Sequence, residues 1–199
     1  MNDILLAIDS STLRLQLGLS IGEKTDILCV DIAKKGKKLG HGEILFAQIE
    51  KLLKRNEISY QDLTKICVIS GPGSFTGLRI GIAAVRSFFL ALKVDVVGIP
   101  TLLALSLKEK DKTDFNIIID ARRDEVFSQS FFKAGKAKAD PILMDKKDGL
   151  VISESNIDME ILVQFALKAK PEDFPVMPCY IRKADAKIST KANIVQIKR

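Results

Sequence analysis

Few residues in this chain could carry out chemistry. The single histidine is His41, and the three cysteines, Cys29, Cys67 and Cys179, lie far apart with no CxxC pair. A structural zinc site needs about four nitrogen or sulfur ligands, so we expect no metal centre and no cofactor. A lone histidine beside glycines at the start of a predicted helix is typical of a cap or a surface group. We interpret the cysteines as buried structural thiols in a reducing compartment.

Two carboxylates stand in a pattern that is typical of nucleotide-binding proteins. Each closes an apolar run, at 3–9 and at 115–120, and is followed by a short turn. The first turn is rich in hydroxyl groups, and such turns let backbone N–H groups approach a phosphate. The candidates for a vestigial nucleotide site are Asp9, Ser11, Thr12 and Asp120.

The second turn fits a phosphate less well. Residues 121–124 contain no glycine and place two bulky side chains there, Arg122 and Arg123. These arginines favour structural ion pairs with Asp9 or Asp120, and phosphate recognition is the alternative.

The most informative segment is SGPGSFTGLRIG at 70–81. Gly73, Gly77 and Gly81 recur every four residues, so they share one helical face or the turn that leads into it. The segment does not match a Walker loop, because Gly77 is followed by Leu78 rather than by lysine. Its glycine spacing also departs from the dinucleotide fingerprint. Spacing alone leaves two interpretations, close packing of another backbone and close approach of a ligand.

Strands and helices alternate along the chain, which is typical of the α/β class. The stretch 13–19 alternates strictly, with Leu13, Leu15, Leu17 and Leu19 on one face. The tail at 183–199 alternates only weakly and receives no assignment. We expect strands at 3–9, 13–19, 26–33, 65–70, 94–99, 115–120, 125–132, 142–145 and 150–153, and helices at 41–56, 75–92, 102–108 and 157–170.

The chain divides into two halves of similar design. Each half opens with an apolar strand that ends in aspartate, a short turn and a second strand. Two such lobes are typical of sugar kinases, actin and Hsp70-like proteins, whose two turns grip nucleotide phosphates. We therefore expect residues 1–104 to form an N-terminal lobe and residues 105–199 to form a smaller C-terminal lobe.

The helix expected at 75–92 is apolar almost all round. Its charges, Arg79 and Arg86, are seven residues apart and share one stripe. Such a helix must be buried on more than one side, so it needs a second cover besides its own sheet. That cover is the helix at 41–56, another subunit, or both. No apolar stretch reaches the roughly 20 residues that span a bilayer, so we expect a soluble protein without membrane contact.

The net charge is +6, from 31 lysines and arginines and 25 acidic residues. The basic runs at 34–38 and at Lys133, Lys136 and Lys138 contain no interleaved aromatic residue, and tryptophan is absent. This pattern favours a solvated lysine-rich surface over a stacking platform for RNA. Direct RNA binding through phosphate neutralisation is the alternative.

Six segments of the chain resemble the TsaB (YeaZ) family, and the resemblance covers about the first 130 residues well. Gly42 replaces the usual serine of the family's first helix, and Asp124 stands where glycine is common. The matching segments are ILLAIDSST at 4–12, GHGEILFAQIEKLL at 40–53, SGPGSFTGLRIG at 70–81, VVGIPTLLAL at 96–105, IIIDARRDEVF at 117–127 and PCYIR at 178–182.

The resemblance implies a two-lobed actin-like fold (ASKHA, RNase H-like) with a reduced second lobe. It also implies a noncatalytic cytoplasmic subunit required to make threonylcarbamoyladenosine in tRNAs that read ANN codons. Such a subunit is the heterodimer partner and activator of the transferase TsaD, acts together with the ATPase TsaE, and forms a homodimer in isolation. Its own contact with tRNA is expected to be indirect or weak.

The resemblance further implies that the helices at 41–56 and 75–92 pair with TsaD in a helical bundle. TsaD resembles a metalloprotein with an HxxxH pair on a helix, whereas this chain has Ile44 and Leu45 after His41. The alternative to a noncatalytic partner is an ATP-binding actin-like phosphotransferase, with Asp9 and Asp120 holding a metal–nucleotide complex. The expected interface residues are Leu45, Phe46, Ile49, Leu53, Gly73, Phe75, Thr76, Gly77, Ile80, Gly81 and Ala84.

Overall fold

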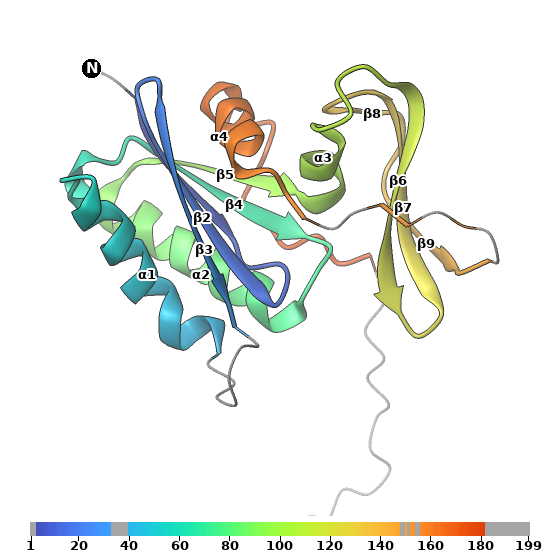
Figure 1. Ribbon diagram of the computed structural model, residues 1–199, viewed down its shortest axis with the longest axis horizontal. Coiled ribbons are helices and arrows are strands. Elements are labelled where there is room, and N and C mark those ends of the chain that lie inside the picture. Colours follow the sequence, from blue (N-terminus) through green and yellow to red (C-terminus); the bar gives the residue numbers. More distant parts are fainter. Residues whose placement is uncertain (1–2, 33–39, 148–149, 151, 154–155, 182–199) are drawn as a thin grey trace, which may run out of the picture.

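The computed structural model describes residues 3–32, 40–147, 150, 152–153 and 156–181. Within these ranges the chain forms a five-stranded sheet, a four-stranded sheet and the helices that cover them (Figure 1). The first sheet consists of β1 (Ile4–Asp9), β2 (Arg14–Ile21), β3 (Lys24–Asp31), β4 (Lys65–Gly71) and β5 (Asp95–Pro100). The helices are α1 (His41–Arg55), α2 (Phe75–Leu92), α3 (Thr101–Ser106) and α4 (Met159–Lys168).

The strand order of the first sheet is β3-β2-β1-β4-β5. Strands β1, β2 and β3 form an antiparallel meander, and β4 and β5 add parallel strands beside β1. Antiparallel neighbours need only a short turn, whereas each parallel strand follows a helical crossover, α1 or α2. This is the RNase H-like order, so the predicted α/β fold of actin-like design is confirmed.

The two faces of the first sheet are both covered. On one face Leu15, Leu17 and Leu19 are fully buried in a core with α1 and α2. On the other face α3 and α4 pack against the sheet, and a Cβ placed on Gly18 would lie 3.0 Å from Val163 of α4. Leu13 was predicted on the same face as the other leucines, but it precedes β2 and is 61% exposed.

The second sheet consists of four strands, with β6, β7 and β8 in that order and β9 also paired to β7. Helix α3 lies between the two sheets, where Leu102, Ile117 and Phe131 belong to one apolar cluster (Figure 1). The proposed boundary between residues 104 and 105 falls inside α3, and α4 from the second half covers the first sheet. The strand bounds are β6 (Thr113–Arg122), β7 (Glu125–Lys133), β8 (Lys136–Ala137) and β9 (Ile142–Asp145).

Local capping sets where two of the helices begin. Ser74 starts α2, because its hydroxyl accepts a hydrogen bond from the Gly77 N–H at 3.4 Å. Asp158 starts α4, because its carboxylate accepts from the N–H groups of Glu160 and Ile161, each at 3.0 Å. By length and composition α2 could cross a membrane, but in this fold it packs on the first sheet as a core helix.

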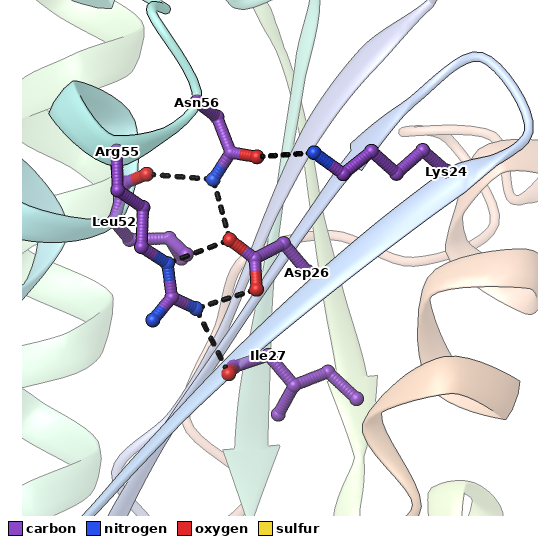
Figure 2. Close-up of polar contacts among 6 residues, drawn as sticks. All are labelled: Lys24, Asp26, Ile27, Leu52, Arg55 and Asn56. Carbon is purple, nitrogen blue, oxygen red and sulfur yellow. Dashed lines mark hydrogen bonds and ion pairs between the residues drawn. The ribbon is translucent and has the colours of Figure 1, made fainter.

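A polar network ties the end of α1 to the edge strand β3 (Figure 2). Arg55 donates through Nε and Nη2 to the two carboxylate oxygens of Asp26, both at 2.6 Å, and Asn56 donates to the same carboxylate at 2.5 Å. Burial tends to raise the pKa of Asp26, but the hydrogen bonds from Asn56 and Arg55 outweigh it and lower the pKa. The network fixes the C-terminal end of α1 against the edge of the first sheet.

The structure differs from the sequence expectations in three short segments. The 3₁₀ turn η1 (Tyr60–Asp62) and the two-residue β8 were not predicted. The strand predicted at 150–153 is wrong for its described residues, which form no ladder, although the Ser153 N–H donates to the Ile118 carbonyl at 2.7 Å. One such bond holds a segment beside a sheet without making it a strand. The tail at 183–199 lies outside the described residues.

Candidate partner-binding surface

The turn after β1 is closed by its own hydrogen bonds. Asp9 is fully buried, and its Oδ1 accepts from the backbone N–H and the hydroxyl of Ser11, at 2.9 and 2.6 Å. The amide of Gln16 donates to Oδ2 of Asp9 at 3.3 Å, and Thr12 bonds to Arg14. The side chains of Asp9, Ser11 and Thr12, which were predicted to face a phosphate, therefore form hydrogen bonds within the chain itself.

The glycine-rich segment packs directly against this turn. A Cβ on Gly73 would lie 2.7 Å from the Ser11 carbonyl oxygen, and one on Gly81 would lie 2.5 Å from the Ser10 hydroxyl. The Ser10 hydroxyl also donates to the Gly77 carbonyl at 2.8 Å. Of the two interpretations of the glycine spacing, close packing of another backbone is the one that the structure supports, and that backbone is the chain's own turn.

The second turn has a different environment. Asp120 is exposed, and its carboxylate accepts from the Arg122 N–H at 3.3 Å. Arg122, Arg123 and Asp124 all have positive φ, between 54° and 63°, so the backbone here curls in the left-handed region. Within the described residues no three histidine, cysteine or acidic side chains gather into a metal-binding group. A nucleotide site that joins Asp9 to Asp120 stays a prediction.

The outward side of α2 and its neighbour α1 carries exposed aromatic and aliphatic side chains. Phe75 is 56% exposed, Phe89 50%, Leu90 76%, and Phe46 of α1 49%. Exposed apolar groups of this size on adjacent helices are typical of a surface that another molecule covers. We call Phe46, Phe75, Phe89 and Leu90 the helical face.

The structure sorts the predicted interface residues into two groups. Gly73, Phe46, Phe75 and Thr76 are exposed and Ile80 is partly exposed, so they can reach a partner. The remaining residues lie in the chain's own core, because the strongest apolar stripe of each helix faces the sheet. The predicted contact residues that do not reach the surface are Leu45, Ile49, Leu53, Gly77, Gly81 and Ala84.

Aromatic packing closes the seam between α1 and α2. Phe88 lies edge-on to Phe46, with ring centroids 5.8 Å apart, and stacks on Tyr60 at 5.5 Å. Burial, together with the nearby Glu50 carboxylate, raises the pKa of Tyr60. The two helices therefore present one continuous surface.

Residues 174–181, which we call the C-terminal strap, run along α2 and extend this surface. The Gly98 N–H donates to the Phe174 carbonyl at 2.9 Å, Arg86 to the Val176 carbonyl at 2.9 Å, and the Cys179 N–H to the Ser70 carbonyl at 2.8 Å. These bonds lead the strap from the edge of β5 to the start of α2. Burial raises the pKa of the Cys179 thiol, which belongs to the strap.

Arg79 clamps the end of the strap to α2. Its guanidinium carbon lies 3.8 Å from the centre of the Phe75 ring, and its Nε donates to the Tyr180 hydroxyl at 3.1 Å. Tyr180 is half-exposed and lies beside Phe75 of the helical face, with ring centroids 5.8 Å apart. Sequence reasoning missed Phe89, Leu90 and Tyr180, although the PCYIR segment was a signal for Tyr180.

Comparison with known proteins gives the family. A family model described as "TsaD: tRNA N6-adenosine threonylcarbamoyltransferase" matches residues 37–151, more than half of the chain. The TsaB protein of Buchnera aphidicola subsp. Schizaphis graminum is 31% identical over 130 residues, which cover 64% of this chain and 60% of that protein. The chain belongs to the TsaB (YeaZ) family.

Other members of the family match a larger part of this chain. TsaB of Bacillus subtilis strain 168 is 27% identical over 177 residues, covering 87% of this chain and 69% of that protein. YeaZ from Pseudomonas aeruginosa superposes with a TM-score of 0.70 at 21% identity, over 89% of this chain and 99% of that one. The likeness to YeaZ shows the fold. The chain spans about 60% of the length of the Buchnera relative.

Proposed function

We propose that this chain is a noncatalytic subunit of the machinery that makes threonylcarbamoyladenosine in tRNAs reading ANN codons. In this role it is the heterodimer partner and activator of a TsaD-type transferase, acts together with TsaE in the cytoplasm, and pairs with itself when the transferase is scarce. The curated relatives are named tRNA threonylcarbamoyladenosine biosynthesis protein TsaB, which supports the pathway.

The observation that carries the proposal is the helical face. It presents large exposed apolar side chains on two packed helices, which a monomeric protein seldom exposes together. Burying such side chains contributes about 25 cal/mol for each Å² removed from water, so a covering partner gains most from this face. A buried Asp9 with internal hydrogen bonds supports a partner role over an ATP-dependent one.

Charge adds a constraint on the partner. Helix α2 exposes Arg79 and Arg86 and contains no acidic residue, whereas α1 exposes both acidic and basic side chains, with Glu50 paired to Lys54 at 3.0 Å. A partner that places acidic side chains beside Arg79 and Arg86 would complement this charge.

Replacing Leu90 with glutamate tests the proposal. Leu90→Glu places a charge at the most exposed apolar position of α2 and should weaken binding to the source cell's TsaD by about tenfold or more. Ile142→Glu, on β9 of the second sheet and 56% exposed, is the matched control and should bind normally. Titration calorimetry with purified TsaD measures both variants. Equal affinities for the two variants would remove the helical face from the proposal.

A further inference from the structure

The second sheet carries an exposed aromatic ring that two lysines contact. Phe132, near the end of β7, is 50% exposed. The Nζ atoms of Lys136 and Lys138 lie 5.9 and 5.1 Å from the centre of its ring. Both distances are within the range of cation–π contacts, so the ring and the two ammonium groups form one unit.

Strand register explains why this ring faces outward. Phe131 is fully buried against α3 and the first lobe, and successive residues of a strand point to opposite faces, so Phe132 lies on the outer face of the second sheet. Ser130 and its cross-strand partner Asn116 share that face, and the Ser130 hydroxyl donates to the Asn116 side-chain oxygen at 2.7 Å. The ring therefore sits beside amide and hydroxyl groups that are capable of hydrogen bonding to a base edge.

The lysines around the ring are incompletely neutralised. Lys138 forms an ion pair with Asp114 at 2.5 Å. Within the part of the chain that the structure describes, neither Lys133 nor Lys136 forms an ion pair. No aromatic residue interleaves with this basic run in the sequence, but the β7–β8 hairpin brings Lys136 and Lys138 over the ring of Phe132.

We propose that Phe132, Lys136 and Lys138, which we call the Phe132 patch, bind a single-stranded stretch of RNA. One base would stack on the ring of Phe132, and the lysines would neutralise the flanking phosphates. An acidic peptide would satisfy the lysines but would not use the face of the ring, whereas every base has such a face. The combination of ring and cations therefore favours a nucleic acid.

The Phe132 patch is separate from the helical face. It lies on the second sheet, on the far side of α3 from α1 and α2 (Figure 1). RNA and a protein partner would therefore not compete for the same residues. The proposal goes beyond the partner role and does not depend on it.

Binding of a fluorescently labelled single-stranded RNA to the full chain, followed by anisotropy at about 50 mM salt, tests the proposal. Phe132→Ala should weaken binding by about fivefold or more, because base–aromatic stacking is lost. Leu13→Ala is the control, since Leu13 is 61% exposed and lies in neither the Phe132 patch nor the helical face, and it should bind like the unmodified chain. Lys136→Gln should reduce the salt dependence, by about 0.7 in the slope of log Kd against log salt.

Three outcomes would overturn the proposal. One is an absence of RNA binding by the unmodified chain at this salt concentration. Another is an equal loss in Phe132→Ala and Leu13→Ala. The third is a loss in the lysine variant with none in Phe132→Ala, which would mean phosphate contact without stacking. Circular dichroism confirms that each variant is folded before binding is measured.

Discussion

Ser10 and Ser11 are the residues against which the glycines of the 70–81 segment pack. Gly73 touches the Ser11 carbonyl and Gly81 touches the Ser10 hydroxyl, so a side chain at either glycine would displace the turn. The N–H of Ser74 also donates to the Ser11 carbonyl at 2.6 Å. At the scale of single residues, the most specific motif of this chain is a packing contact between two loops.

Replacing Gly73 with alanine should therefore destabilise the protein. The new Cβ would meet a backbone oxygen that cannot rotate away, and overpacking of this kind costs about 1–3 kcal/mol. Chemical denaturation measures the change. Gly42→Ala is the control, because its Cβ would meet only the Ile80 side chain at 3.7 Å. A Gly73→Ala variant as stable as Gly42→Ala would show that the turn has room to move.

At the scale of elements, α1 and α2 each divide into a buried and an exposed side. The buried side faces the first sheet, and the exposed side holds the helical face. Two polar contacts fix these helices in place. One is the Asp26–Arg55 ion pair at the end of α1, and the other is the Arg79–Tyr180 hydrogen bond at the start of α2. The orientation of the helical face thus depends on contacts at opposite ends of the helix pair.

The Asp26–Arg55 pair makes stability depend on pH. Because the folded state lowers the pKa of Asp26, its stabilisation is present above the unfolded pKa of about 3.9 and is lost as the pH falls below it. Asp26→Asn should be less stable than the unmodified chain by about 1 kcal/mol at pH 7, and this difference should shrink below about pH 4. Denaturation midpoints over this pH range measure it. Asp95→Asn, at a position with no ion pair in the described part of the chain, should show no such trend.

At the scale of the whole molecule, α3 and α4 join the two halves. Both helices contribute to the apolar cluster that contains Ile69 of the first sheet and Phe131 of the second. Lys65 of β4 adds a polar tie to α4, because its Nζ donates to the carbonyls of Leu167 and Ala169, each at 2.9 Å, and of Ala166 at 3.4 Å. We therefore expect the two sheets to unfold in one transition.

Lys65→Met tests this tie. Methionine keeps most of the apolar stem but leaves the last carbonyls of α4 without their donor, which costs about 1.5–3 kcal/mol. Hydrogen exchange should become faster in α4 while α2 changes less. Lys51→Met, on the exposed side of α1, is the control and should stay within about 0.5 kcal/mol of the unmodified chain. Equal exchange rates in α4 of the two variants would contradict the assignment.

Local patterns in the sequence determined most of the elements. The helix predicted at 75–92 is found at Phe75–Leu92, because apolar periodicity and the Ser74 cap are both local signals. The same patterns favoured a two-lobed α/β chain, since alternating strands and helices need parallel crossovers.

Only the tertiary structure decided which residues reach the surface. A helix that is apolar all round does not reveal which side its own sheet covers, so Leu45 and Ile49 were expected at the interface and proved to be core. Phe132 and its lysines meet only because a hairpin folds the chain back, and Tyr180 reaches Arg79 across about a hundred residues of sequence. Periodicity reports on neighbours along the chain, whereas a surface is made by segments that packing brings together.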